Sequence, residues 1–517
     1  MNVLQMTRVG VISLLSVLLV GGVITVTTAD DQRNAEAKRR IIVNDDGEVV
    51  LPRGGKSWDD YLGARFKDAI GTQVDSYFLN IAATDRGPGI VDSLQSSMAY
   101  WAAGKRLPER YVKATRRYIA AARKADIEIF ASIRMNDVHD SSQTSVSKLT
   151  YPLKVKRPDL LIGEPERLEL GRRAYPDDSL MRWFWCGLDW GEPEVRQHFL
   201  DFIATYCRQF DFDGLELDYF RHPLFFKLGE EEQYLDNMTD FVRQVREVLN
   251  KIGDERKRPY LLAVRVPDTL AFSRRTGLHV ERWLKEGYLD LLVVGGGYLP
   301  YSGRLKELMD LAHRHNVPAY PCLNHFRGPV QMRTVASNFW ALGGDGFYLF
   351  NYFGVTGKEV NPGWGASSSE SLRQIGSPKT LRGLHKLYQP DPGSATAYIG
   401  YNNAPPQLPV RLIDGRAVEL VVGGDVGQAS RQGRVKELRL QVQVANLTQA
   451  EGIAVQVNGH SIRAESVRRV DEKSLTADLT APPLRRGINW LTFLPGPKSN
   501  GALSSQVTGL QLSVRYK

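Results

Sequence analysis

The chain has 517 residues and a formal net charge of +9, with 42% hydrophobic and 24% charged residues. The charges are spread along the chain rather than gathered in blocks. This excludes the basic tracts typical of nucleic-acid-binding proteins but allows weak attraction to an acidic polysaccharide or cell surface. Cysteines occur at Cys186, Cys207 and Cys322, and no Cys or His spacing indicates zinc. We therefore expect no nucleic-acid partner, and stability that comes from apolar cores.

The first 29 residues have the order of a secretory signal. Arg8 precedes an apolar run from Val9 to Val26, and small residues lead to Ala29. We expect cleavage after Ala29 and a secreted or periplasmic protein of the cell envelope. The apolar run nearly reaches the ~17 to 25 residues that span a bilayer. An uncleaved N-terminal anchor therefore stays open as the alternative, and it is the chain's expected route to a membrane.

The sequence that follows predicts strands that alternate with helices. The helical pattern is clearest in Tyr234 to Leu249, whose apolar residues recur at intervals of three and four, as in a helix packed on a sheet. A second such helix begins at Pro193 and runs through Tyr206. The expected strands are Ile41 to Val43, Tyr77 to Ile81, Ile127 to Ile133, Gly214 to Tyr219, Leu261 to Val266, Leu289 to Val294, Val317 to Leu323 and Gly346 to Phe350.

Alternating strands and helices predict a parallel sheet, because a parallel return needs a crossover that is usually a helix. An open doubly wound sheet would normally carry a glycine-rich phosphate loop after its first strand, and here Asn44 to Gly47 follow that strand. We therefore expect a closed (β/α)8 TIM barrel over residues 40–390, without a cofactor. The segment from Met135 to Trp190 has no sustained apolar period and predicts a long loop over one barrel mouth.

The composition changes after the predicted barrel strands. Gly, Ser and Asn dominate from Gly354 to Ser369, and a short helical stretch from Leu372 to Leu387 follows. Residues 395–517 then predict an all-β sandwich domain. Carbohydrate binding and a purely structural role stay open for it. Its expected strands are Val418 to Val422, Leu438 to Val444, Ala454 to Val457, Leu475 to Leu479, Trp490 to Leu494 and Leu510 to Val514.

The fourth barrel strand carries two carboxylates. Because side chains alternate along a strand, Glu216 and Asp218 are expected to face the barrel axis, and Leu215, Leu217 and Tyr219 the helices. Reactive groups of such barrels come from the carboxyl ends of the strands. Two buried like charges require a cation or a raised pKa, the condition in which one carboxyl acts as acid and another as base or nucleophile. The alternative interpretation is an internal ion pair that closes the top of the barrel, with Glu216 bound to an arginine of a neighbouring strand.

The segment from Phe212 to Pro223 resembles the fourth-strand signature of the glycosyl-hydrolase-like family ten barrels. The matching residues are Asp213, Gly214, Asp218, Tyr219 and Arg221. The stretch from Leu188 to Arg196 is similar to that family's entry into the helix before the strand. The resemblance implies a barrel that cleaves or binds glycans, in some relatives those of the bacterial cell wall, with Asp218 at the presumed catalytic aspartate.

A more distant similarity is to the chitinase-type barrels, whose fourth strand has three acidic positions before a proton-donating glutamate. Asp213, Glu216 and Asp218 match the acidic positions in charge, but Phe220 stands at the glutamate position. This similarity therefore does not extend to the substrate-assisted mechanism of those enzymes.

Polar side chains also follow most of the other strands, which packing alone does not explain. Asp268, after the fifth strand, is expected as the second carboxyl beside Asp218, and Glu216 is the alternative. A purely structural interpretation of Asp268 is that it starts a turn or caps a helix. Retention requires ~5 to 5.5 Å between two such carboxyls, and inversion ~6.5 to 9.5 Å. The spacing of Asp137, His139 and Asp140 matches no metal motif, so we expect no metal. The expected substrate-binding residues are Arg134, Asp137, His139, Trp190, Arg221, Arg265, Tyr298, Asn324, His325 and Asn351.

The sequence thus predicts an exported glycoside hydrolase that cleaves a poly- or oligosaccharide by carboxylate acid and base catalysis, with Asp218 central. Two rivals stay open. A carbohydrate-binding barrel without catalysis is favoured by the end of the sixth strand, because Gly295 to Tyr298 offer no carboxylate. An envelope structural protein would use the sandwich for its contacts.

Overall fold

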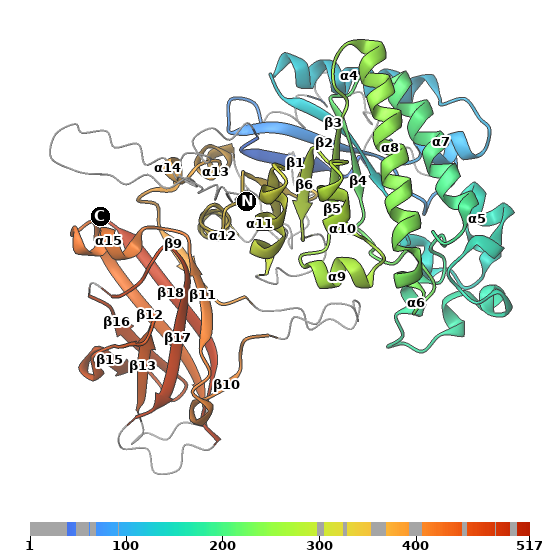
Figure 1. Ribbon diagram of the computed structural model, residues 1–517. Coiled ribbons are helices and arrows are strands. Elements are labelled where there is room, and N and C mark those ends of the chain that lie inside the picture. Colours follow the sequence, from blue (N-terminus) through green and yellow to red (C-terminus); the bar gives the residue numbers. More distant parts are fainter. Residues whose placement is uncertain are drawn as a thin grey trace, which may run out of the picture.

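The computed structural model describes residues 39–47, 62, 69–90, 93–296, 304–323, 328–352, 369–391, 406–446, 452–480, 482–496 and 504–517. The expected signal segment, residues 1–29, lies outside this part of the chain. Among the described residues, none of the helices has the length and apolar character needed to cross a membrane. A barrel surrounded by helices and an all-β part beside it make up the described structure (Figure 1).

Eight parallel strands close into a barrel in chain order, which confirms the predicted (β/α)8 class. Each strand pairs with the next, and the first pairs with the last in register from Ile41 opposite Phe347 to Val43 opposite Leu349. Every strand overlaps the run that predicted it. The strands are β1 (Ile41–Asp45), β2 (Val74–Ala82), β3 (Glu128–Arg134), β4 (Gly214–Asp218), β5 (Leu261–Val266), β6 (Leu291–Val294), β7 (Ala319–Leu323) and β8 (Phe347–Leu349).

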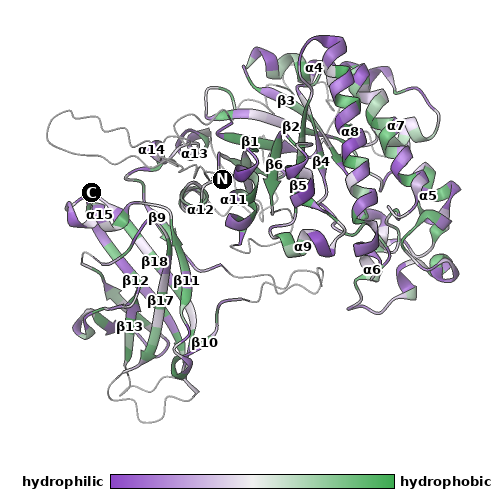
Figure 2. Cartoon of the chain, viewed as in Figure 1, coloured by the Kyte–Doolittle hydropathy of each residue, from purple (hydrophilic) through white to green (hydrophobic). Residues whose placement is uncertain are grey.

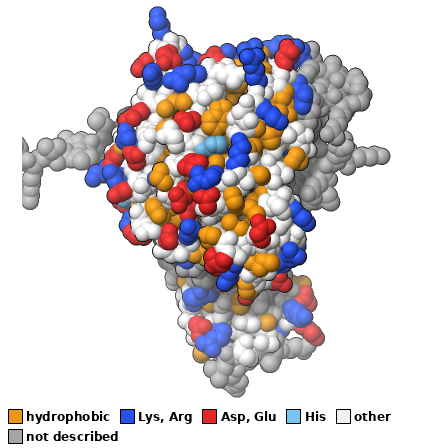
Figure 3. All heavy atoms as spheres, turned by 90° about the vertical axis from the view of Figure 1, so that its right-hand side faces the viewer, with side chains coloured by type: hydrophobic (Ala, Val, Ile, Leu, Met, Phe, Trp, Pro, Cys, Tyr) orange, Lys and Arg blue, Asp and Glu red, His pale blue; other side chains and the backbone are white. Residues whose placement is uncertain are grey.

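Helices cover the outside of the barrel. α7 (Pro193–Gln209) and α8 (Leu235–Arg256) confirm the two helices predicted from apolar periodicity, and they pack against each other. Along both, hydrophilic and hydrophobic residues alternate (Figure 2), as expected for one buried stripe. Further helices around the described part of the barrel are α3 (Ser97–Ala102), α4 (Glu109–Lys124), α9 (Leu270–Arg275), α10 (Val280–Lys285), α11 (Leu305–Arg314) and α12 (Pro329–Ala341). On the face shown in Figure 3, acidic and basic side chains are intermixed.

The barrel interior is filled by alternate side chains of the strands, as the pleat requires. Phe78 and Phe130 stack there at 4.3 Å between ring centroids, beside Tyr348. Gly214 makes room for this stack, because a Cβ atom at its position would lie 2.2 Å from the Phe130 ring. The expected alternation along β4 is confirmed: Glu216 reaches Tyr348 inside the barrel, while Leu215, Leu217 and Tyr219 belong to the core under the helices.

The segment from Met135 to Trp190 is more ordered than the predicted long loop. It folds into α5 (Pro152–Lys156), α6 (Met181–Phe184) and several 3-10 turns, and it buries Tyr151, Leu161 and Trp185 in the main core. Its apolar residues have no regular period because they contact the barrel through these short turns rather than through one long helix. Asn136 fixes its end, because its side chain bonds to both backbone groups of Leu188.

The C-terminal part is a sandwich of two antiparallel sheets, which confirms the predicted all-β class. An apolar core lies between the sheets. The larger sheet contains β9 (Lys386–Tyr388), β10 (Val410–Arg411), β12 (Val435–Ala445), β15 (Val467–Arg469), β16 (Ser474–Asp478) and β18 (Gln506–Tyr516). The smaller sheet contains β11 (Val418–Val422), β13 (Ile453–Val457), β14 (His460–Ser461) and β17 (Gly487–Pro495). A short helix, α15 (Val426–Arg431), follows β11.

The segment between barrel and sandwich differs from the continuous helical stretch expected from Leu372 to Leu387. It forms α13 (Ser369–Gln374) and α14 (Pro378–Leu381), because Gly376 and Pro378 interrupt the helical pattern, and then β9. β9 pairs with β18 of the sandwich and also contacts α12 of the barrel. Gly423 N donates to Asn338 Oδ1 at 2.9 Å across the same junction. The two parts are thus held together by backbone pairing and side-chain contacts.

The close approach at Gly214 gives a first testable prediction. Gly214→Ala should lower the free energy of unfolding by about 1–3 kcal/mol, because the added methyl group overlaps the Phe130 ring in a filled barrel interior. Denaturant unfolding of the full chain measures this loss. Gly452→Ala is the matched control, since a Cβ atom there meets nothing within 4 Å. Equal stability of the two variants would contradict the packing described here.

Candidate functional site

A cluster of charged and histidine side chains lies at the carboxyl ends of β1 to β4, the mouth of the barrel. Arg134, the last residue of β3, forms ion pairs with Asp46 after β1 and with Asp137 Oδ2, the latter at 3.0 Å. Thr84 ties the end of β2 to this group, because its hydroxyl accepts from Asp137 N at 3.0 Å and lies 3.1 Å from Asp137 O. The loops after β1, β2 and β3 are therefore held together around Arg134.

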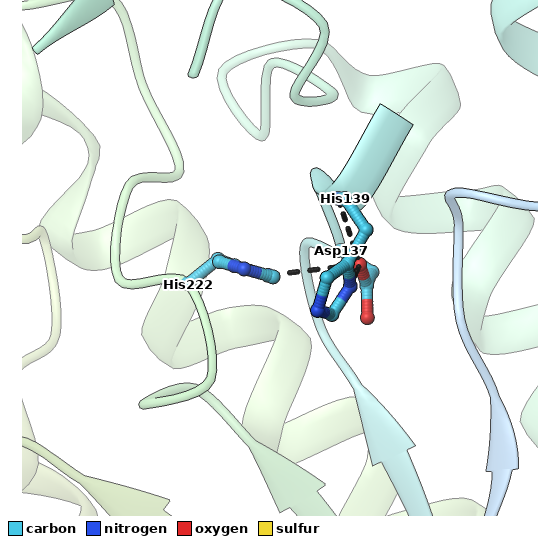
Figure 4. Close-up of side chains that lie close together, drawn as sticks. All are labelled: Asp137, His139 and His222. Carbon is cyan, nitrogen blue, oxygen red and sulfur yellow. Dashed lines mark hydrogen bonds and ion pairs between the residues drawn. The ribbon is translucent and has the colours of Figure 1, made fainter. Parts of the chain in front are cut away.

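Asp137 orients His139, the most exposed member of the cluster (Figure 4). Asp137 Oδ1 lies 2.5 Å from His139 Nδ1, and the His139 backbone N–H also donates to it at 3.1 Å. The His139 ring is 40% exposed, whereas Asp137 is fully buried. Asp85 Oδ2 lies 3.8 Å from the same Nδ1. The ring thus sits between two carboxyl groups that differ in their surroundings.

Arg221 and His222 complete the cluster from the segment after β4. The Arg221 guanidinium donates to Nε2 of His139 at 2.5 Å and faces Nε2 of His222 at 3.3 Å. Because a guanidinium can only donate, His139 accepts at Nε2 and carries its proton at Nδ1, toward Asp137. Burial, together with the charge of Arg221, holds the pKa of His222 well below its usual value, so that this ring is neutral.

One atom each of Asp137, His139 and His222 lies within 4.8 Å of the others, a spacing that a metal ion could bridge. The donor atoms are already in use. Asp137 binds Arg134 and His139, and Nδ1 of His222 accepts from Val138 N at 3.3 Å. The Arg221 cation lies against the opposite nitrogens of both rings. This chemistry fits an arginine-centred network better than a metal centre, because a second cation would be repelled.

Asp85 and Asp137 are neighbouring carboxyls whose pKa values are driven apart. Burial and the nearby charge of Asp137 raise the pKa of Asp85 to about 8. For Asp137, burial acts in the same direction, but the hydrogen bond from His139 and the charge of Arg134 outweigh it and hold its pKa well below the usual value. Asp85 Oδ1 has no hydrogen-bond partner among the described residues. At neutral pH one group therefore holds a proton next to one that is ionised, the arrangement of an acid and its orienting anion.

A fully buried lysine of the insertion binds the backbone of Asp137. Lys154 Nζ donates to the carbonyl of Asp137 at 3.1 Å and to Asp140 Oδ1 and Oδ2 at 3.1 and 3.2 Å. The Cys186 thiol donates to Asp140 Oδ1 at 3.1 Å. Burial raises the pKa of Cys186 well above its usual value, so its sulfur is not a nucleophile. The insertion thus fixes the backbone on which Asp137 and His139 stand.

Asp218, the expected central carboxylate, forms a buried ion pair. Arg265 Nε donates to its Oδ1 and Nη2 to its Oδ2, both at 2.8 Å. The backbone N–H groups of Phe220 and Arg221 also donate to Oδ1, each at 3.0 Å. Arg265 is fully buried with its guanidinium 4.1 Å from the centre of the Phe350 ring. This is the internal ion pair that the sequence left open, with Asp218 rather than Glu216 as its acidic partner.

Glu216 lies one inward position deeper in the barrel and is completely buried. Its Oε2 accepts from the Tyr348 hydroxyl at 3.0 Å. Burial and the charge of Asp218 raise its pKa to about 8, so it is protonated at neutral pH. The Asp218–Arg265 pair occupies the next inward position of β4 and β5, between Glu216 and the mouth. Glu216 is therefore a neutral interior group rather than a group in contact with a substrate.

Asp268 follows β5, three strands from Asp85 in the barrel order. It is 3% exposed, and burial raises its pKa to about 7. Its Oδ1 has no hydrogen-bond partner in the described part of the chain. The N-cap of α9 is Thr269, not Asp268, because the Thr269 side chain accepts from Phe272 N. The capping role that competed with a functional one in the sequence thus belongs to the neighbouring residue.

The remaining residues that were expected to bind substrate lie in different surroundings. Asn351 is buried after β8, with φ of 49°, and its N–H donates to Asn44 Oδ1 at 3.1 Å. The expectation that Trp190 binds substrate is wrong. Its ring is fully buried against Phe199 of α7 and Phe241 of α8, so it cannot stack on a sugar. Tyr298, Asn324 and His325 lie outside the described residues.

Three residues of the cluster were missed or given too little weight when the site was predicted from the sequence. Asp46 and Asp85 follow the first two strands, and Lys154 lies in the insertion. The position of the two aspartates at strand ends was a usable signal, because all eight carboxyl ends of a barrel meet at one mouth. Lys154 gave no signal, since a lysine in an irregular segment is ordinarily exposed.

Known proteins add little beyond the fold. No protein-family model and no curated protein matches the chain, so the resemblance to the family ten barrels stays a prediction. An alpha-amylase structure from Malbranchea cinnamomea is 12% identical over 91% of this chain and 99% of its own, with a TM-score of 0.39. A noncanonic maltogenic alpha-amylase from Thermotoga neapolitana is 11% identical over 87% and 98%, with a TM-score of 0.36.

A cycloisomaltooligosaccharide glucanotransferase from Paenibacillus sp. is 9% identical, with a TM-score of 0.33, and the match covers 93% of this chain but 58% of that one. All three names belong to carbohydrate-active proteins. Identities and TM-scores of this size carry no activity over to this chain. The function is therefore argued below from the side chains at the mouth.

The buried ion pair gives a second prediction. Asp218→Asn should lower the free energy of unfolding by about 3–5 kcal/mol, because it leaves the Arg265 cation buried without its anion. Asp478→Asn is the matched control: Asp478 also binds an arginine, Arg439, at 2.8 Å, but on the exposed sandwich surface, so its loss should be far smaller. Denaturant unfolding compares the two. Equal losses would contradict a structural role for Asp218.

Glu216 gives a third prediction, on pH. Its folded pKa of about 8 exceeds its ordinary value of 4.5, so the unfolded state loses its proton first and the stabilisation of the neutral form is lost as the pH rises toward 8. Glu216→Gln keeps a neutral side chain. Its stability relative to the unsubstituted protein should therefore rise between about pH 5 and pH 8, by an amount on the order of a few kcal/mol, and stay constant at higher pH.

Denaturant unfolding at several pH values tests this, with the exposed Glu281→Gln as control. The stability difference between Glu216→Gln and the unsubstituted chain should grow with pH, and the control difference should stay constant. A difference that is independent of pH would show that Glu216 is ionised in the folded barrel.

Proposed function

We propose that this chain is a glycoside hydrolase that cleaves glycosidic bonds of a poly- or oligosaccharide at the barrel mouth, with Asp85 as the proton donor. The observation that carries the proposal is the buried Asp85–Asp137 pair at the mouth, whose carboxyl oxygens lie 3.8 Å and 2.5 Å from His139 Nδ1. Burial and the charge of Asp137 raise the pKa of Asp85, whereas the pKa of Asp137 is held below its usual value. Cleavage of a glycosidic bond requires a protonated carboxyl next to the leaving oxygen. A donor with a pKa near the working pH is the most effective.

The groups around Asp85 hold it and the sugar in place. Asp137 fixes the ring of His139 through Nδ1, which leaves the exposed part of the ring at the mouth. Arg134 and Arg221 hold the acidic and histidine side chains of the cluster. Hydroxyl groups of a sugar suit such a network, because each can donate to a carboxylate and accept from an arginine. We assign His139 and Arg221 to substrate binding on this basis.

We assign the second carboxyl, which activates water or attacks the sugar, to Asp268. It follows β5, three strands from Asp85 in the barrel order, and one of its oxygens has no partner in the described residues. Asp218 becomes a positioning residue: it holds the backbone of Phe220 and Arg221, and so the direction of the Arg221 side chain.

Export is part of the same proposal. The basic, apolar and small-residue order of residues 1–29 supports a secretory signal. An uncleaved anchor would keep the barrel at the membrane surface with the same site.

A carbohydrate-binding barrel without catalysis is the second candidate. The saturation of Asp218 favours it, because the aspartate that the family resemblance marks as catalytic already accepts four hydrogen bonds from Arg265 and the backbone. In this alternative the mouth binds glycans through the same network and releases no sugar.

The fourth prediction tests the proton donor. Asp85→Asn should lower kcat for glycan hydrolysis by roughly 10²- to 10⁴-fold, with glycan binding retained, because the amide keeps the shape but cannot give a proton. Reducing-sugar release from a panel of plant, algal and bacterial glycans measures it. The control is Asp345→Asn, a buried aspartate that binds His313 and Ala319 N at the opposite end of the barrel. It should leave kcat per folded molecule unchanged.

The pH profile separates the two carboxyls. Activity of the unsubstituted protein should fall above about pH 8, as Asp85 loses its proton, and below about pH 7, as Asp268 gains one. Asp268→Asn should lower kcat, and the activity that remains should lack the acidic limb. If the protein binds glycans but releases sugar from none of them, and Asp85→Asn does not change this binding, the proposal of a hydrolase is wrong and the carbohydrate-binding barrel takes its place.

A further inference from the structure

The smaller sheet of the sandwich turns one face away from the sandwich core. Along β17 the residues alternate between buried and outward positions, and Trp490 is an outward one, 44% exposed. Asn458 fixes the backbone of the strand at this position, because Trp490 N donates to Asn458 Oδ1 at 2.9 Å and Asn458 N donates to Trp490 O at 2.8 Å. A large aromatic ring is thus presented to solvent on a rigid strand.

Hydrogen-bonding side chains share the face with this ring. Glu419 on β11 is the direct cross-strand partner of Trp490, and Thr492, two residues further along β17, pairs with Gln456 on β13. Residues in register or two apart on one face lie within about 4.5–8 Å of each other. A carboxylate, a hydroxyl and an amide therefore flank the ring. An apolar protein partner would require a larger continuous apolar area than one ring surrounded by polar groups.

The same face leads toward the barrel. One step along the ladder, Val421 of β11 and its partner Ile488 of β17 pack against the barrel core, next to the Gly423 to Asn338 bond on α12. Two residues of strand span about 7 Å, so Trp490 stands just outside the junction. Arg304, at the start of α11, influences the ionisation of both Glu419 on the sandwich and Asp268 at the mouth. Glu419 and Asp268 are therefore both near the start of α11, and β11 lies on the barrel side of the sandwich (Figure 1).

We propose that Trp490, with Glu419, Thr492 and Gln456, forms an aromatic platform that holds an extended polysaccharide chain whose end enters the barrel mouth. The C–H face of a sugar ring stacks on the indole, and the three polar side chains bond to its hydroxyl groups. This inference rests on the proposed function and narrows it: the preferred substrate is a polymer that reaches from mouth to sandwich rather than a short oligosaccharide.

The test measures binding separately from hydrolysis. The full-length protein carrying Asp85→Asn is run in native gels that contain hydroxyethyl cellulose, xylan, amylose or alginate, and retardation by the polymer is compared with and without Trp490→Ala. We expect the alanine variant to lose affinity for the retarding polymer by roughly tenfold, the effect of one lost stacking contact. Trp490→Phe should restore part of it, since an aromatic face remains.

Trp183→Ala is the matched control, because Trp183 is also 44% exposed but lies on α6 in the barrel insertion. With the catalytic aspartate restored, Trp490→Ala should raise KM for the polymer and leave kcat and the rate on a short oligosaccharide unchanged. The platform is overturned if none of the polymers retards the protein, if Trp490→Ala binds as tightly as its parent, or if only Trp183→Ala weakens binding. If Trp490→Ala loses retardation but the protein hydrolyses none of the glycans, the proposed platform stands and the proposed hydrolase activity is wrong.

Discussion

A charge inside a closed barrel must be paired or neutralised, because the interior offers little water to solvate it. This constraint decides the roles of the acidic residues in this chain. On β4 it yields one ionised group, Asp218, which is clamped by Arg265, and one neutral group, Glu216, which accepts from Tyr348. Both carboxyls are bonded to side chains inside the barrel. The carboxyls that remain for catalysis are therefore those nearer the mouth, after β2, β3 and β5.

The same constraint explains why the mouth is built as a network. Arg134 is shared by Asp46 and Asp137, and Arg221 by two histidines, so that each cation satisfies more than one partner. Lys154 extends this network into the insertion. Asp85 is at its margin, bordered by Arg86 on one oxygen at 3.3 Å and without a described partner on the other, and this incomplete pairing is what allows it to keep a proton.

Much of the fold could be predicted from the sequence because its signals are local. Apolar periods gave α7 and α8, and short β-branched runs gave all eight barrel strands, including the inward direction of Glu216 and Asp218. The site was harder, since ion-pair partners come from different strands. Nothing in the sequence says that Arg265 binds Asp218 rather than Glu216, or that Trp190 packs under two helices. Asp85 could be found only by asking which strand ends meet.

β18 is an inner strand of its sheet, between β12 on one side and β9 and β10 on the other. All of its partners precede it in the chain. During synthesis, β12 therefore has no neighbour on the side of β9 and β10 until β18 emerges, and β9, which leads out of the barrel, has no strand to pair with. The barrel strands are made earlier and can pair first, whereas the larger sheet and its backbone pairing to β9 are completed only when β18 is made.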